Sequence, residues 1–144
     1  LNAIGDLNSL PDKVKEELES IIENTKNNTG MTLTLALSYG GKQEIFKAVK
    51  EISEKVKNDI IFLDNFDDSV INDHLYTRNL PDVDLLIRTS GEQRISNFLL
   101  WKIAYAELYF TDVYWPDFTE KDFTKAIIEY QNRERRFGKT SKQL

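Results

Sequence analysis

The sequence contains no cysteine among its 144 residues. Disulfide bonds, zinc–thiolate centres and catalysis by a thiol are therefore excluded. It also lacks an apolar run long enough to span a bilayer. Because its net charge is -5, the chain has no bulk attraction to nucleic acid or to an anionic membrane. Phosphate chemistry would need a local basic cluster, and basic residues do gather near the C-terminus, in the stretch RERRFGKTSK.

Prolines and glycines are few, and apolar periodicity can be followed between them. Helices are expected at about 11–29, 45–56, 67–77, 94–104 and 116–136. Strand-like stretches lie at the start of LNAIGDL (1–7), within MTLTLALSYGG (31–41) and at 81–88, and AELYFTDV (106–113) is a candidate for a further strand. This alternation predicts an α/β fold, a mainly parallel β-sheet flanked by helices, in a single domain over residues 1–144.

The first residues, LNAIGDL, resemble the end of a strand that runs into a loop, and the chain does not begin with methionine. We therefore expect the first elements of the fold to be missing from these 144 residues.

The most informative stretch is DLLIRTSGEQRISNFLLW, residues 84–101. Arg88 ends an apolar strand, and Arg94 and Ser96 open the expected helix at 94–104. In parallel sheets, ligands bind beyond the carboxyl ends of strands, where helix N-termini offer unpaired N–H groups. Two guanidinium forks match phosphate oxygens, and Gly91 would let the backbone approach a ligand. The pattern indicates a phosphate site with room for more than one unit of charge.

A simpler interpretation of the same residues stays open. The two arginines could form surface ion pairs with Glu92 and Asp84, while Ser90 or Ser96 caps a helix. Spacing alone does not separate this interpretation from a phosphate site, because short motifs often match by accident.

Glu107 stands out because its neighbours in WKIAYAELYF are aromatic or aliphatic. A buried carboxylate needs a cation or hydrogen-bond donors. The residues alone favour an arginine partner, and a Mg²⁺ ion is the alternative.

Two other features have ordinary structural interpretations. Asp67 and Asp68, with Asp64 nearby, resemble an aspartate-rich magnesium motif of all-helical enzymes, but they lie where a helix N-terminus attracts acids. The only histidine, His74, has no partner motif and is assigned a surface or packing role.

Residues 81–118, with the stretches IGDLNSLP, LTLALSYGGKQEI and NRERRFG, resemble the cis-prenyltransferase family over nearly the whole chain. The resemblance implies an Mg²⁺-dependent transferase that condenses isopentenyl diphosphate with an allylic diphosphate such as farnesyl diphosphate. The product would be a cis-polyprenyl diphosphate for cell-wall carrier lipid. It also implies a cytoplasmic bacterial homodimer, with no nucleic-acid partner and at most peripheral membrane contact through the lipid product.

The resemblance assigns roles to individual residues. The diphosphate of isopentenyl diphosphate would be held by Arg88, Arg94, Ile95 and Ser96. It also implies that Glu107 binds Mg²⁺, which reverses the preference for an arginine partner.

The family's C-terminal Arg-x-Gly motif corresponds to Arg136 and Gly138 and would reach a diphosphate across the homodimer interface. One small departure is Lys42, where the family often has arginine.

The larger departure is that the family's Met-Asp-Gly-Asn-Gly-Arg-Trp and Ser-x-Glu-Asn-Trp segments do not occur in these 144 residues. The first of them carries the catalytic aspartate and the allylic diphosphate loop, so no catalytic residue is assigned here. We expect the chain to carry the isopentenyl diphosphate half-site and to be inactive alone. The alternatives are a non-catalytic partner subunit and, less favoured for want of a glycine-rich phosphate loop, a nucleotide-binding module.

Overall fold

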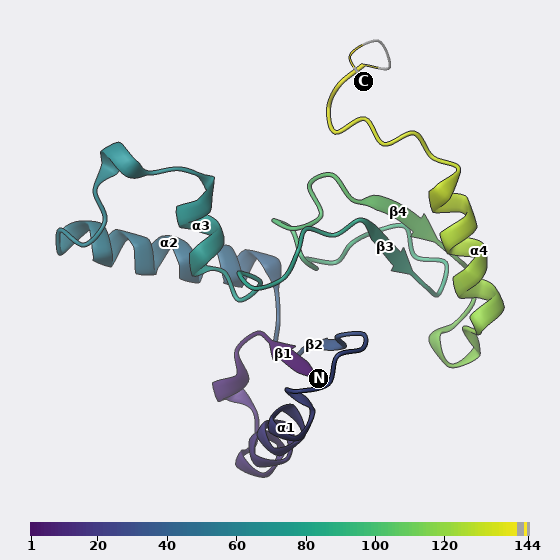
Figure 1. The fold of residues 1–144 in the computed structure, drawn as a ribbon, viewed down its shortest axis with the longest axis horizontal. Coiled ribbons are helices and arrows are strands. Elements are labelled where there is room, and N and C mark those ends of the chain that lie inside the picture. Colours follow the sequence, from purple (N-terminus) through teal and green to yellow (C-terminus); the bar gives the residue numbers. More distant parts are fainter. Residues whose placement is uncertain (141–142, 144) are drawn as a thin grey trace. The chain divides into compact units, whose positions relative to one another are not determined.

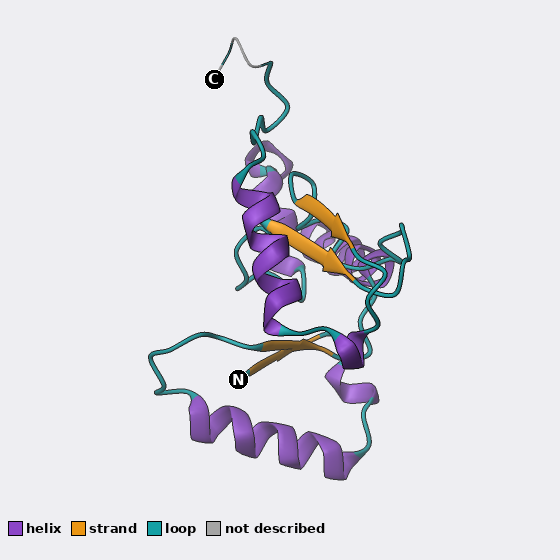
Figure 2. Cartoon of the chain, turned by 90° about the vertical axis from the view of Figure 1, so that its right-hand side faces the viewer, coloured by secondary structure: helices purple, strands orange, loops and turns teal. Residues whose placement is uncertain are grey.

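The computed structural model describes residues 1–140 and 143, in two compact units, Leu1–Leu80 and Pro81–Leu144 (Figure 1). Each unit contains one two-stranded parallel sheet with helices (Figure 2). The predicted α/β class with parallel strands is confirmed. The prediction of one domain stays a prediction.

In the first unit, β1 (Asn2–Ile4) pairs with β2 (Thr34–Ala36), with Ala3 opposite Leu35. The connection between these strands contains a 3₁₀ turn, η1 (Leu7–Ser9), and helix α1 (Asp12–Thr25). The helix begins just after Pro11, as predicted.

Helix α2 (Gly41–Lys57) follows the Tyr39–Gly40 turn, and η2 (Leu63–Asn65) and α3 (Asp68–His74) come next. The core of the unit gathers the apolar stripes of these elements and is formed by Ile4, Leu18, Ala48, Ile52 and Leu75.

Glu44, on the first turn of α2, is also buried in this unit, with only 1% of its surface exposed. Its Oε1 accepts hydrogen bonds from the backbone N–H and the hydroxyl of Thr77, at 2.9 and 2.8 Å. Its Oε2 accepts one from the Tyr39 hydroxyl at 2.5 Å. Three donors therefore replace the water that this carboxylate loses on burial, and they fix the loop before α2 to the segment after α3.

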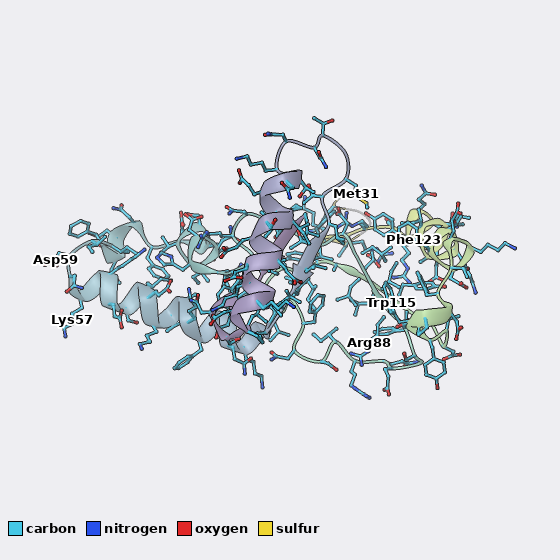
Figure 3. The ribbon with its side chains drawn as sticks, turned by 90° about the horizontal axis from the view of Figure 1, so that it is seen from below. Met31, Lys57, Asp59, Arg88, Trp115 and Phe123 are labelled. Carbon is cyan, nitrogen blue, oxygen red and sulfur yellow. The ribbon has the colours of Figure 1, made fainter. Side chains whose placement is uncertain are left out.

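In the second unit, β3 (Leu85–Arg88) pairs with β4 (Glu107–Phe110). After β4 the chain forms η3 (Trp115–Asp117) and α4 (Glu120–Gln131), which packs beside β4 (Figures 1 and 2). Thr119 is the N-cap of α4: its hydroxyl and its backbone N–H both donate to Asp122, in a capping box. Exposed apolar side chains include Met31 in the first unit and Trp115 and Phe123 in the second (Figure 3).

The predicted helix over 94–104 is wrong. Residues 91–106 form turns and loop, with no helix between β3 and β4. Ser96, Asn97 and Leu99 have positive φ values of 47, 64 and 48°, in the left-handed region that a right-handed helix cannot contain. The apolar residues whose spacing suggested a helix lie in an irregular segment. No helix N-terminus therefore lies beside Arg94.

Candidate diphosphate site

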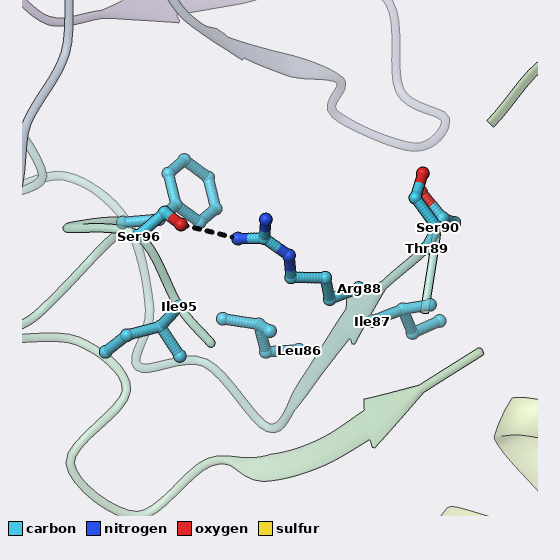
Figure 4. A pocket seen from close by; sticks show the side chains of 8 residues that line it. Leu86, Ile87, Arg88, Thr89, Ser90, Ile95 and Ser96 are labelled. Carbon is cyan, nitrogen blue, oxygen red and sulfur yellow. Dashed lines mark hydrogen bonds between the residues drawn. The ribbon is translucent and has the colours of Figure 1, made fainter. Parts of the chain in front are cut away.

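The carboxyl end of β3 opens into a pocket of about 360 Å³ in the second unit. Arg88 is the last residue of the strand, and the loop after the strand returns to face it (Figure 4). The lining residues are Leu86, Ile87, Arg88, Thr89, Ser90, Ile95, Ser96 and Phe98. The pocket therefore has an apolar floor, one guanidinium and three hydroxyls.

Arg88 and Ser96 are joined directly across this pocket. Arg88 Nη1 donates to Ser96 Oγ at 2.9 Å, and the contact is exposed to solvent (Figure 4). The hydroxyl is a neutral acceptor, so the positive charge of the guanidinium is not neutralised by this bond. An anion in the pocket would find a cation already oriented beside a hydroxyl donor.

The loop after β3 is held by backbone hydrogen bonds to the chain after β4. The amide of Ser90 donates to Val113 O, and that of Gly91 donates to Thr111 O, both at 2.9 Å. Gly91 has φ +71°, and a Cβ added there would lie 3.0 Å from Asp112 Oδ1. The glycine is therefore needed for the close approach of Asp112, whereas the sequence suggested the approach of a ligand.

Arg94 does not join the residues that line this pocket. Its guanidinium forms an ion pair with Glu92, and its side chain is 62% exposed. This is one of the surface pairs that the simpler interpretation of the sequence expected. Asp84, the other expected partner, binds Arg135 instead. The structure thus brings Arg88, Ile95 and Ser96 together and leaves Arg94 outside.

Glu107 lies at the other end of the same sheet. It is opposite Leu85, the first residue of β3, whereas Arg88 is opposite Phe110. At about 3.3 Å per residue, the two ends are about 10 Å apart. Glu107 Oε2 accepts a hydrogen bond from Arg133 Nη1 at 3.0 Å, so the carboxylate has the arginine partner that the residues alone favoured.

The residues that the structure describes do not form a magnesium site by themselves. Within residues 1–140 and 143, no group of three or more His, Asp or Glu side chains could hold a metal ion. Glu107 contributes one carboxylate, and that carboxylate is bound to a cation of the protein. Its assignment as a metal ligand stays a prediction, which would require ligands from elsewhere.

The segment after α4 carries the other two predicted site residues. Arg136 Nε and Nη2 donate to Glu134 Oε2 at 3.0 and 2.8 Å, and both side chains are half exposed. Gly138 has φ +79° and lies beside the ring of Tyr105. Part of the basic stretch noted in the sequence, residues 141–142, lies outside the described residues.

Two arginines of this segment have contacts that the sequence analysis did not assign. Arg133 binds Glu107 and Glu129, and Arg135 binds Asp84. The available signal was their alternation with Glu134 and Arg136 in the stretch RERR.

A family model described as "Putative undecaprenyl diphosphate synthase" matches residues 1–138. The chain belongs to this family.

Curated relatives of this chain have names that fit the undecaprenyl diphosphate synthase family. An isoprenyl transferase of Clostridium perfringens is 49% identical over 138 residues, which cover 96% of this chain and 54% of the relative. A ditrans,polycis-undecaprenyl-diphosphate synthase of Haemophilus influenzae, described as specific for (2E,6E)-farnesyl diphosphate, is 51% identical over 140 residues, 97% of this chain and 59% of the relative. The chain thus spans between half and three-fifths of the length of these relatives.

Two solved structures have the same fold. Lavandulyl diphosphate synthase from Lavandula x intermedia, crystallised with dimethylallyl diphosphate, superposes with a TM-score of 0.91 at 39% identity and covers 96% of this chain and 59% of that one. A probable undecaprenyl diphosphate synthase from Campylobacter jejuni superposes with a TM-score of 0.79 at 38% identity, and the match covers 95% of this chain and 62% of that one.

In this member of the undecaprenyl diphosphate synthase family, the acidic stretch near α3 has a capping role. Asp67 Oδ1 accepts hydrogen bonds from the hydroxyl and the amide of Ser69, which hold the pKa of this carboxyl below its usual value. His74 is buried, with Nδ1 2.7 Å from Val70 O and Nε2 2.8 Å from Lys55 Nζ. Asp67 thus caps α3 and His74 packs inside the unit, which are structural roles of the kind the sequence indicated. Among the helices described, none is both long enough and apolar enough to cross a membrane.

Proposed function

We propose that residues 1–144 supply the isopentenyl diphosphate half-site of a cis-prenyltransferase that makes undecaprenyl or a related cis-polyprenyl diphosphate for cell-wall carrier lipid. The contact of Arg88 with Ser96, at the rim of a strand-end pocket, is the observation that carries the proposal. The family supplies the rest: a relative from Haemophilus influenzae is described as specific for farnesyl diphosphate, and a solved relative contains an allylic diphosphate.

The proposed work of this pocket is to bind and orient. Arg88 and Ser96 would hold diphosphate oxygens, while the apolar floor at Leu86 and Ile87 would take the hydrocarbon end. Holding the nucleophilic substrate in place lowers the entropic part of the barrier, because reaction with the allylic partner then needs no further search. Ile95 contributes to the apolar wall. Arg94 would join the site by leaving Glu92, which costs little because exposed ion pairs are weak.

Several parts of the proposal are supported by the family alone. These are magnesium dependence with Glu107 as one ligand, a homodimer in which Arg136 and Gly138 reach a diphosphate of the other subunit, a cytoplasmic location, and one catalytic domain that includes both units. Since the family's allylic diphosphate segment is not among these residues, we also propose that the chain alone binds isopentenyl diphosphate weakly and turns over nothing. A non-catalytic partner role has no specific observation in its favour.

Calorimetric titration of the 144-residue chain with isopentenyl diphosphate tests the proposal. Arg88→Gln should weaken binding by roughly tenfold or more, since a hydrogen bond to a charged group contributes about 1.5–3 kcal/mol. Arg78→Gln, an exposed arginine of the first unit, is the matched control and should bind like the parent chain. Equal affinity in Arg88→Gln and the parent would refute the half-site, and turnover of farnesyl and isopentenyl diphosphates by the chain alone would refute the predicted inactivity.

A further inference from the structure

The segment after α4, residues 132–138, is called here the C-terminal arm. The charged side chains of the arm have two kinds of partner. Arg133 binds Glu107 at the start of β4, and Arg135 binds Asp84 just before β3. Glu134 and Arg136 bind each other. Because residues 134–136 have no regular secondary structure, side-chain contacts must set the course of the arm.

Arg133 makes three contacts at the start of β4. Its Nη1 donates to Glu107 Oε2 at 3.0 Å and to the Leu108 carbonyl at 2.9 Å, and its Nη2 donates to Glu129 Oε1 at 2.6 Å. The bonds to Glu129 and to Glu107 raise the pKa of the Arg133 guanidinium above its ordinary value. The planar fork thereby joins the last turn of α4 to the first two residues of β4.

Arg135 repeats this arrangement at the neighbouring strand. Its Nη1 donates to Asp84 Oδ1 at 2.6 Å and to the Tyr130 hydroxyl at 3.0 Å. Asp84 lies just before β3, and its carbonyl accepts the Glu107 amide at 2.9 Å. The two carboxylates that receive the arm thus stand on adjacent chain segments.

Aromatic contacts complete the attachment of the arm. The Arg135 guanidinium lies 4.5 Å from the centre of the Phe137 ring, and that ring lies 6.1 Å from the ring of Tyr105. Gly138 follows against the same tyrosine. Arg136 is therefore the outward residue between two attached neighbours, with its side chain 55% exposed.

We propose that Glu107 and Asp84 anchor the C-terminal arm through Arg133 and Arg135, and so position Arg136 to bind a diphosphate. The binding of diphosphate by Arg136 rests on the proposed function, whereas the anchoring of the arm does not. Arg133 and Arg135 are positioning residues: they touch the protein, and Arg136, the neighbour of Arg135, reaches the ligand. This role accounts for the hydrogen bond between Glu107 and Arg133.

Hydrogen–deuterium exchange of the intact chain tests the anchoring. The Lys139 amide donates to the Arg136 carbonyl at 2.8 Å, so amides 136–140 report the order of the arm. Glu107→Gln and Arg133→Gln should each speed exchange there by about fivefold, and the double variant should add nothing. Arg133→Lys keeps the charge but loses the planar fork of the guanidinium, so its exchange rate should lie between those of the parent chain and Arg133→Gln. Glu16→Gln, on an exposed face of α1, is the control and should change nothing.

Calorimetric titration with inorganic diphosphate tests whether Arg136 binds a diphosphate. The titration is done on the same variants and on Arg136→Gln. Arg136→Gln should weaken binding with the arm still ordered, and Arg133→Gln should weaken it with the arm loosened. Unchanged exchange at 136–140 in Glu107→Gln would overturn the anchoring. Faster exchange with unchanged diphosphate affinity in every variant would uphold the anchoring and overturn the assignment of Arg136 to diphosphate.

Discussion

Arg88 and Ser96 stand eight residues apart in the sequence and meet at 2.9 Å across the mouth of one pocket. The meeting depends on the left-handed backbone at Ser96 and Asn97, which turns the loop back toward the strand end. The hydroxyl therefore restrains a guanidinium that would otherwise sample many rotamers. In energetic terms, part of the entropy cost of binding an anion is met before the anion arrives.

The first prediction concerns this restraint. Ser96→Ala should lower the affinity for isopentenyl diphosphate by about five- to tenfold, because a donor to the ligand and an acceptor from Arg88 are both lost. Calorimetric titration gives the ratio directly. Ser53→Ala, which removes a hydroxyl bound to its own helix at Val49 O, is the control and should leave the affinity unchanged. An affinity in Ser96→Ala equal to that of the parent would show that the contact has no part in binding.

The second prediction concerns Gly91. Gly91→Ala should lower the free energy of unfolding of the second unit by about 1–2 kcal/mol, since alanine would meet both a left-handed backbone and the Asp112 carboxylate at 3.0 Å. Both tryptophans, Trp101 and Trp115, lie in that unit, so urea unfolding followed by fluorescence measures it. Gly30→Ala meets nothing within 4 Å and should leave urea unfolding, followed by circular dichroism, unchanged. A neutral Gly91→Ala would contradict the close approach of Asp112.

The third prediction concerns Glu44. Glu44→Ala should cost about 2–4 kcal/mol of stability, because the buried amide and hydroxyl of Thr77 would lose their acceptor and the Tyr39 hydroxyl would lose its bond to Glu44. Urea unfolding followed by circular dichroism should show the loss in the first unit, while tryptophan fluorescence tracks the second. Glu54→Ala, exposed on the same helix, should cost less than about 0.5 kcal/mol. Similar losses for the two variants would mean that the buried network adds no stability.

The fourth prediction concerns pH and the start of α4. Hydrogen bonds from the Thr119 hydroxyl, then from its backbone amide, hold the pKa of Asp122 below its ordinary value of 3.8. Since the folded pKa is the lower one, the stabilisation is fully present above about pH 4. It is lost as the pH falls through the folded value.

Asp122→Asn should therefore flatten the acid limb of the unfolding curve of the second unit below about pH 4, as followed by tryptophan fluorescence. Asp117→Asn, in η3, is the control and should keep the steep limb of the parent chain. An equally steep limb in Asp122→Asn would show that the capping box does not couple stability to pH.

Much of the fold was predictable because its signals are local. Three helix starts are marked by the residue just before the helix: Pro11 before α1, Asp67 before α3 and Thr119 before α4. Asp67 and Thr119 take part in hydrogen bonds with backbone N–H groups of the first turn, and Pro11 has no N–H group of its own. The apolar run that ends at Arg88 marks a buried strand for the same reason. The prediction for segment 94–104 failed because its apolar spacing suits a helix, whereas three of its residues adopt left-handed φ values.

The sequence by itself determined the starts of α1, α3 and α4, the parallel α/β class, the family and the position of Arg88 at a strand end, since each depends on residues close together in the chain. Only the tertiary structure decided which charges meet. It paired Arg88 with Ser96, Arg94 with Glu92, and Glu107 with Arg133. A hydrogen bond forms only when donor and acceptor lie about 3 Å apart, and the attraction between two charges weakens with distance and is screened by salt. Separation along the sequence says little about such distances. For that reason the arm that carries Arg136 could be understood only after the starts of β3 and β4 were placed beside it.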